Sequence, residues 1–178
     1  MSQHETSSHE GGPLAWIAGI AILLVLAGFQ ISPLAAWGPI RADGLLVLAM
    51  AWAALAGSTR GLVFGMISGA VADTLIGGGV TFTLLRGLLG WGMGRLRPVL
   101  NVRQPAISVP LVALATVLQE AALGVAHHDW SHFEQIWLPA LLANSLIAWP
   151  LYRLAAAIWR PGRGPAPSRH PSSRAAGS

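Results

Sequence analysis

The sequence predicts an all-α integral membrane protein, folded as a compact bundle of six transmembrane helices. Hydrophobic residues make up 53% of its 178 residues and charged residues only 10%, whereas a soluble domain carries about 25% charged residues. The mean hydropathy is +0.57, and the apolar residues gather in long segments. This composition is typical of a chain that places most of its apolar surface in a bilayer.

Six apolar segments are candidate spans. They are residues 14–31, 44–57, 61–76, 80–96, 106–126 and 136–159. Because a helix rises about 1.5 Å per residue and the hydrocarbon core is about 30 Å thick, an upright span needs roughly 20 residues. The second segment is short by this measure, and only Gly77, Gly78 and Gly79 separate the third from the fourth. An arrangement of five spans with one re-entrant segment therefore stays open.

Polar tails flank the transmembrane domain, which is predicted to cover residues 14–160. Residues 1–13 lack aliphatic content, and residues 161–178 are rich in Pro, Gly, Ser and Arg, so both tails are predicted to be disordered. No Lys or Arg precedes the first apolar segment. Its apolar run also exceeds the usual signal-peptide core of about 7–15 residues. We therefore expect a retained helix and not a cleaved signal peptide.

The arginines predict the orientation. All 11 basic residues are arginine. In the six-span arrangement Arg41 and Arg86 fall on one side, and the others fall opposite: Arg60, Arg95, Arg97, Arg103, Arg153, Arg160, Arg163, Arg169 and Arg174. The richer side is expected to be cytoplasmic, with both termini inside. Because these arginines lie beside apolar segments and form no single patch, no nucleic-acid partner is expected.

The tryptophans fit an aromatic belt in part. Trp16 and Trp159 are predicted at the inner membrane boundary, and Trp37, Trp130 and Trp137 at the outer one. Trp52, Trp91 and Trp149 lie deeper in their segments and do not fit a belt.

Small residues recur at regular steps in the third and fourth segments. They are Gly61, Gly65 and Gly69 in the stretch "RGLVFGMISGAVAD", and Gly87, Gly90 and Gly94 in the next segment. A step of four residues turns a helix by about 400°, so the first three glycines and Asp73 share one face. Glycines at this spacing let a neighbouring backbone approach closely. They predict either a tight pairing of these two helices within the chain or a contact with another protein.

Several ionisable side chains are predicted to be structural charges within the membrane domain: Arg41, Asp43, Asp73, Arg86 and Glu120. Such groups are normally paired or face a cavity. For Asp73 the expected partners are Arg86, Arg41 or the backbone amides of the turn at Gly77–Gly79. A proton-relay or substrate role is the alternative. Glu120, next to Gln119 and Thr116, is a functional candidate, or is buried against Arg86 or Asn144.

The stretch from Arg41 to Leu96 resembles the core of MreD, the rod shape-determining membrane protein family of bacteria. The similarity lies in an Arg-x-Asp sequence that opens an aliphatic run closing on Trp52-Ala53. A glycine-spaced helix ending in Asp73, a glycine-rich turn and a further helix ending in Gly-Arg-Leu at residues 94–96 complete it. The resemblance covers about a third of the chain in detail and the remainder by hydropathy alone.

This resemblance implies a non-enzymatic scaffold of the cell-wall elongation machinery, which helps determine rod shape from the bacterial inner membrane. Its implied partners are MreC, MreB, RodA and the penicillin-binding transpeptidase that works with RodA. The implied architecture is similar to the substrate-binding subunits of energy-coupling-factor transporters, which supplies an alternative function in vitamin binding. In that case small residues such as Ala15 and Gly19 would dock a partner.

Metal binding and catalysis are not expected. The sequence "HHDWSH" at residues 127–132 would place His128 and His132 on one helical face, but spacing fixes no third ligand. No Ser-His-Asp set, phosphate-binding loop or His-Glu-x-x-His helix is present. Asp73 and Glu120 could form an intramembrane acid pair, but the sequence favours a protein without cofactor or enzymatic activity.

Overall fold

The computed structural model describes residues 12–31, 42–77, 79–101 and 104–159, and within these ranges it is all-helical, without strands. Its six helices are α1 Pro13–Gln30, α2 Gly44–Ala56, α3 Ser58–Ile76, α4 Thr81–Leu96, α5 Pro105–His127 and α6 Trp130–Ile158. The predicted all-α class is confirmed for the described residues. Five predicted segments begin and end within three residues of the helices. The sixth helix starts six residues before its predicted segment, because the polar stretch from Trp130 to Gln135 is helical although it is not apolar.

Four helices contain segments long and apolar enough to cross a membrane: Pro13–Gln30, Ser58–Ile76, Ala106–Ala126 and Phe133–Ile158. The 13 residues of α2 extend only about 20 Å at 1.5 Å per residue. The 16 residues of α4 also fall short of the roughly 20 that an upright crossing needs. The structure thus supports a membrane protein with four candidate spans and two shorter helices.

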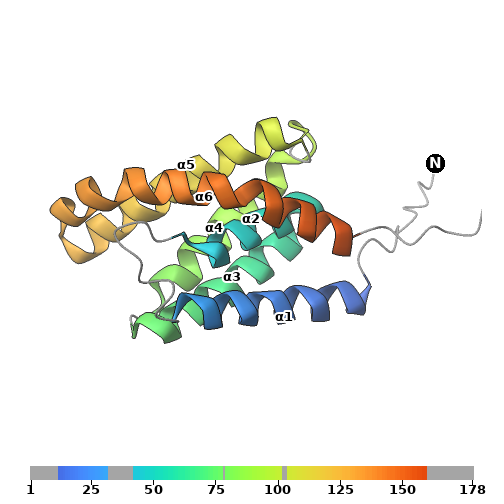
Figure 1. Cartoon of the computed structure of the whole chain (residues 1–178), viewed down its shortest axis with the longest axis horizontal. Helices are drawn as coiled ribbons and strands as arrows, with labels where there is room; N and C mark the ends of the chain where they lie inside the picture. The colour runs from blue at the N-terminus through green and yellow to red at the C-terminus, as the bar shows by residue number, and fades with distance from the viewer. Residues whose placement is uncertain (1–11, 32–41, 78, 102–103, 160–178) are drawn as a thin grey trace, which may run out of the picture.

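The helices alternate in direction along the long axis of the molecule. Figure 1 shows α1 along one side, the α5–α6 pair along the other, and α2, α3 and α4 between them. α1 begins and α6 ends at the same end of the molecule, and the turn between α5 and α6 lies at the opposite end (Figure 1). We call the first of these the terminal end and the second the turn end.

The central element is α2. Residues 44–55 are all buried, and α2 packs against each of the other five helices. Its sequence, GLLVLAMAWAALA, is apolar on every side, and a helix of that kind is stable only where it is enclosed. A single residue, Gly57, separates α2 from α3. Its φ of +92° is a conformation that residues with a side chain rarely adopt, which explains a glycine at this corner.

The glycine-rich helices α3 and α4 make the most extensive contact of any two helices in the described ranges. A methyl group added to Gly61 would lie 2.6 Å from the carbonyl oxygen of Gly90, and one added to Gly65 would lie 2.8 Å from the carbonyl carbon of Arg86. Gly69 meets the backbone of Phe82 and Thr83 in the same way, and Gly94 meets Gly57 and Ser58. Each step of four residues along α3 is matched by four residues back along α4, as a regular antiparallel contact requires.

These contacts decide between the two interpretations of the glycine spacing. The chain's own backbone covers the glycine faces of both helices, so these faces are not available to another protein. The covered glycines are Gly61, Gly65 and Gly69 of α3 and Gly90 and Gly94 of α4. Gly87 is buried too, but a Cβ there would first meet the flexible side chain of Met66 at 2.7 Å, and the Leu62 carbonyl oxygen lies farther away at 3.7 Å. Gly87 therefore sets the distance between the two helices less strictly than the other five.

Aromatic side chains fill the core toward the terminal end. The ring of Trp52 stacks on Phe64 with 4.6 Å between the ring centroids. It also makes edge-to-face contacts with Trp16 and Trp159, with centroid distances of 5.6 Å and 4.9 Å. Gly19 is required beside this cluster, because a Cβ there would lie 2.6 Å from Trp52. Trp159 is only 3% exposed, so its predicted place in an interfacial belt is wrong: it completes the aromatic core.

The inward face of α1 carries Ala15, Gly19, Leu23 and Ala27. Ala15 and Gly19 therefore pack inside the chain, and the expectation that they would dock a transporter partner is wrong.

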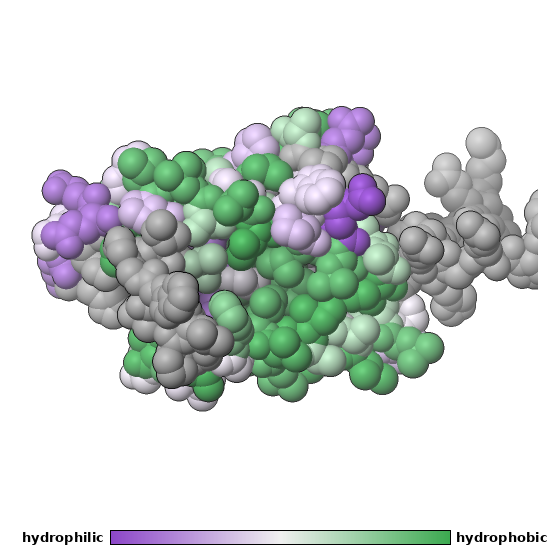
Figure 2. Space-filling view, viewed as in Figure 1, coloured by the Kyte–Doolittle hydropathy of each residue, from purple (hydrophilic) through white to green (hydrophobic). Residues whose placement is uncertain are grey.

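Apolar side chains also cover much of the outside. Figure 2 shows a broad hydrophobic surface between hydrophilic regions that lie toward the two ends of the long axis. Large exposed apolar residues occur on α1, α4 and α6, for example Val25, Leu88 and Leu146. An apolar belt between two polar ends is the arrangement that a bilayer stabilises.

We expect Gly65→Ala to destabilise the protein, because the added methyl group overlaps the Arg86 carbonyl group. Overpacking of this kind costs about 1–3 kcal/mol, and Gly65→Leu should cost more. Thermal unfolding of the full chain in detergent measures the change. The control is Gly92→Ala in the same pair of helices, where nothing lies within 4 Å of the added atom. Equal stabilities of the two alanine variants would contradict the proposed register.

Candidate functional site

Polar side chains from all six helices meet in the interior around the start of α2. We call this set the polar network. Its members are Gln30 of α1, Asp43 at the N-cap of α2, Ser68 of α3, Arg86 of α4, Thr116 and Gln119 of α5, and Asn144 of α6. Most lie in segments that are otherwise apolar. A polar group in such surroundings is stable only if it is hydrogen-bonded.

Asp43 is the centre of the polar network. Its Oδ1 accepts hydrogen bonds from the Leu46 amide at 3.0 Å, which caps α2, and from Gln30 Nε2 at 3.2 Å. Its Oδ2 accepts one from Gln119 Nε2 at 2.9 Å and forms an ion pair with Arg86 Nη2. Four donors thus surround one carboxylate. This is the arrangement that stabilises an ionised acid away from water.

The Arg86 side chain is 2% exposed, and its guanidinium group donates hydrogen bonds to several neighbours. Nε donates to Gln119 Oε1 at 3.0 Å, and Nη1 donates to the carbonyl and hydroxyl oxygens of Ser68, both at 3.4 Å. The guanidinium carbon also lies 5.0 Å from the centre of the Phe82 ring. Because Gln119 contacts both charged groups, it fixes the position of one relative to the other.

Asn144 connects α6 to the polar network. Its Oδ1 accepts a hydrogen bond from the Asp43 amide at 2.6 Å, and its Nδ2 donates to Thr116 Oγ1 at 2.9 Å. The Thr116 hydroxyl donates in turn to the carbonyl oxygen of Val112 at 3.0 Å. The chain of donors therefore ends on a backbone carbonyl group within α5. The Asn144 and Thr116 side chains are therefore hydrogen-bonded although both are fully buried.

Asp43 and Arg86, the acid and the cation of this network, are paired with each other. Neither lines the hollow at Gly57, Ser58 and Arg97 or the hollow around Asp73 and Thr83. The Asp43 side chain is 18% exposed. The network joins six helices at one level of the molecule.

Asp73 accepts its hydrogen bonds from the start of α4. Its Oδ1 accepts from the Phe82 amide at 3.1 Å, and its Oδ2 accepts from the Thr83 amide at 2.9 Å and the Thr83 hydroxyl at 2.6 Å. The carboxylate of α3 thus caps the first turn of α4, where amides lack a partner within the helix and the helix dipole favours an anion.

The expected ion pair between Asp73 and Arg86 is wrong, because Arg86 pairs with Asp43. Capping is the role that the structure gives Asp73, but the amides belong to Phe82 and Thr83, beyond the Gly77–Gly79 turn. Arg41, the other expected partner, lies outside the described residues.

Glu120 follows a member of the polar network in the sequence. It is half-buried, and its neighbour Gln119 is the residue that contacts Arg86 and Asp43. An acid pair of Asp73 and Glu120 does not form, because α3 and α5 do not pack against each other within the described part of the chain.

The sequence carried a signal for the missed members Gln119, Asn144 and Ser68, since each is a polar residue in an apolar segment. It gave no means of assigning their partners.

The sequence "HHDWSH" forms the turn between α5 and α6. His128 has a left-handed backbone with φ of 52° and ends α5, and the amide of Asp129 donates to the carbonyl oxygen of Gly124 at 3.0 Å. His128 therefore lies in the turn after α5, and His132 lies in α6, so the two residues do not belong to one helix. In the part of the chain that the structure describes, no three His, Asp or Glu side chains gather in a way that could hold a metal ion.

Comparison with known proteins returns no relative. No family model matches this sequence, and no curated protein or solved structure matches it either.

Removing one member of the buried ion pair should destabilise the protein strongly. Asp43→Asn leaves the Arg86 charge without its counter-ion, a change that costs about 3–5 kcal/mol in protein interiors. Unfolding in detergent measures it, with Glu134→Gln at an exposed site of α6 as the control. The double variant Asp43→Asn with Arg86→Gln should lose less than the sum of its single changes. Additive losses would show that the two groups do not act as a pair.

Asp73→Ala should destabilise the start of α4. Two backbone amides and one hydroxyl lose their acceptor, and loss of a helix cap costs about 1–2 kcal/mol. Hydrogen–deuterium exchange should accelerate at Phe82 and Thr83. The matched control is Thr74→Ala, whose exposed hydroxyl donates only to carbonyl groups of its own helix. If exchange in α4 is unchanged in Asp73→Ala, the cap is unimportant.

Proposed function

We propose that the protein is a non-enzymatic scaffold of the cell-wall elongation machinery in the bacterial inner membrane. It acts with MreC and MreB, close to RodA and its penicillin-binding transpeptidase, and helps determine rod cell shape. The proposed orientation places both termini in the cytoplasm, on the side richer in arginine. The proposal starts from the resemblance of residues 41–96 to MreD.

One observation carries the proposal: the residues of that stretch that give the resemblance also hold helices together. Asp43 anchors the polar network. Gly61, Gly65 and Gly69 pack α3 onto α4, and Asp73 caps α4. A pattern of glycines and acids that holds helices together fits a scaffold, because a scaffold binds its partners through a rigid membrane-embedded surface.

The non-enzymatic part of the proposal rests on how the buried charges are used. General acid–base catalysis needs a group that can exchange a proton with a substrate within about 2.6–3.2 Å. The carboxylates of Asp43 and Asp73 each accept three or more hydrogen bonds from the chain itself. Both carboxylates are thus already engaged by donors of the chain, which favours anchoring over turnover.

A vitamin-binding subunit of an energy-coupling-factor type transporter is the second candidate. The observation that favours it is a hollow of about 550 Å³ near the turn between α3 and α4, lined by Ala70, Asp73, Thr74, Gly77, Gly79, Val80 and Thr83. Its size lies within the range of about 300–1,000 Å³ that small-molecule sites occupy. Against it stands the engagement of Asp73 in the α4 cap, which leaves the acid less able to bind a ligand.

Detergent co-purification of the tagged full chain from its own cells, with mass spectrometry of proteins and small molecules, distinguishes the two functions. We expect MreC, MreB, RodA and the transpeptidase with the wild-type chain and with Gly92→Ala. Gly65→Leu should recover several-fold less, because the α3–α4 pair is disturbed. Paired ATPases with a bound vitamin would instead establish the transporter function. Recovery of neither group would overturn both proposals.

A further inference from the structure

Two helices present the same pattern of exposed residues to the outside. We call these sets the exposed stripes: Val80, Leu84, Leu88, Trp91 and Arg95 along α4, and Leu138, Leu142, Leu146, Trp149 and Arg153 along α6. Steps of four, four, three and four residues place each set on one helical face. Within the described ranges α4 and α6 do not pack against each other, so the pattern occurs at two separate places on the apolar belt.

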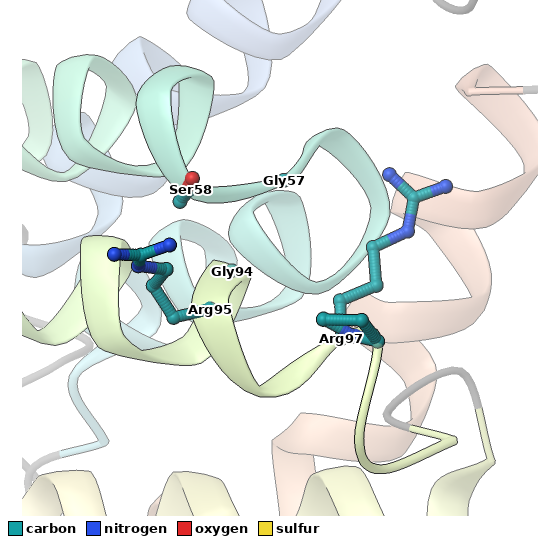
Figure 3. A pocket seen from close by; sticks show the side chains of 6 residues that line it. Gly57, Ser58, Gly94, Arg95 and Arg97 are labelled. Carbon is teal, nitrogen blue, oxygen red and sulfur yellow. The ribbon is translucent and has the colours of Figure 1, made fainter.

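An arginine over a tryptophan ends both stripes toward the terminal end. The guanidinium carbon of Arg95 lies 5.3 Å from the ring centre of Trp91, and that of Arg153 lies 5.4 Å from the ring centre of Trp149. Figure 3 shows the Arg95 side chain turned away from Arg97. Each arginine is thus directed back toward the tryptophan one turn earlier, and not outward from the end of its helix. Tryptophan and arginine are the residues that mark a membrane interface.

The turn from Gly77 to Gly79 ends the α4 stripe at the turn end. This turn separates α3 from α4, and its backbone groups lie outside a helix, so they are stable in headgroups or water and not among acyl chains. On the same pair of helices α3 carries Arg60 near its start and reaches the turn at its other end. The apolar part of this pair therefore has a polar limit at both ends.

Glu120 and Trp137 mark the corresponding limit on the α5–α6 pair. A Cβ on Gly124 would lie 3.4 Å from Cβ of Phe133, so these two positions are level in the antiparallel pair. One helical turn further along each helix brings Glu120 level with Trp137. The α6 stripe begins at the next residue, Leu138. Figure 1 shows the turn between α5 and α6 reaching beyond the turn between α3 and α4, so the tip of this longer pair leaves the belt.

The belt between these limits is thin. Each exposed stripe extends about 22 Å from its first apolar residue to its arginine, at about 1.5 Å per residue. The distance from Arg60 to Gly77 along α3 is about 25 Å by the same measure. A typical bilayer has a hydrocarbon core of about 30 Å. Two helix pairs thus agree on an apolar thickness that is several Å too small for such a bilayer (Figure 2).

We propose that the apolar belt binds phospholipids with short acyl chains and thins a bilayer of longer chains around the protein. Tilting the helices cannot relieve this mismatch, because tilt shortens a span further. The helices also cannot slide past one another to lengthen the belt, since the Asp43–Arg86 pair and the glycine contacts of α3 and α4 fix their relative depth. The lipid must therefore adapt. The inference requires only that the protein lies in a membrane and does not depend on the proposed scaffold function.

Competition between lipids for the full chain in phosphatidylcholine vesicles tests the inference. Brominated dioleoyl phosphatidylcholine quenches tryptophan fluorescence, and the exposed Trp91 and Trp149 report lipid at both stripes. Dimyristoleoyl phosphatidylcholine, with shorter chains, should displace the brominated lipid at least about threefold better than the longer dierucoyl lipid does. Equal displacement by the two lipids, or stronger displacement by the dierucoyl lipid, would overturn the inference.

A pair of double variants tests whether the arginines limit the belt. Arg95→Leu with Arg153→Leu lengthens both stripes by about one turn, or about 5 Å, and should reduce the preference for the short lipid below about twofold. The matched control is Arg95→Lys with Arg153→Lys, which keeps a cation at both positions and should keep the preference. An unchanged preference in the leucine variant, or an equal loss in both variants, would contradict a belt limited at these two positions.

Discussion

The buried ion pair of Asp43 and Arg86 is the interaction on which the arrangement of the six helices depends. In a bilayer, apolar helices gain little from packing on each other instead of on lipid, and the wholly apolar α2 could occupy many rotations and depths with similar energy. A charged pair removes that freedom, since any shift of α2 would separate Asp43 from Arg86, Gln119 and Asn144. One level of the molecule is thereby fixed, and every helix contributes a side chain to it.

Close packing of α3 and α4 fixes what the polar network leaves free. Arg86 belongs to α4, a 16-residue helix with a glycine-rich sequence that is shorter than an upright span needs. The glycines of α3 accept its backbone at near contact, and Asp73 caps its first turn. Arg86 therefore reaches Asp43 from a helix whose rotation and depth are already set. The polar network and the close packing of α3 and α4 depend on each other, because misplacement of α4 would leave both buried charges without partners.

The sequence predicted the helices well and their connections through side chains poorly, for a physical reason. Hydropathy marks apolar runs along the chain, and these runs coincide with helices α1 to α5. The regularly spaced glycines of α3 and α4 predicted two surfaces of close backbone approach, but they left open whether these helices pair with each other or with another protein. The sequence did not predict which residue pairs with a buried charge. Asp43, Arg86 and Gln119 come from three helices, and neither composition nor period specifies which charge meets which. Asp73 was expected to pair with the arginine that Asp43 holds.

The same glycine register that builds the core also shapes the surface at the terminal end. Gly94 lies against the backbone of Gly57 and Ser58, and this contact brings the end of α4 under the corner that begins α3. Arg95 in the last turn of α4 and Arg97 in the turn after it come to opposite sides of that corner as a consequence (Figure 3).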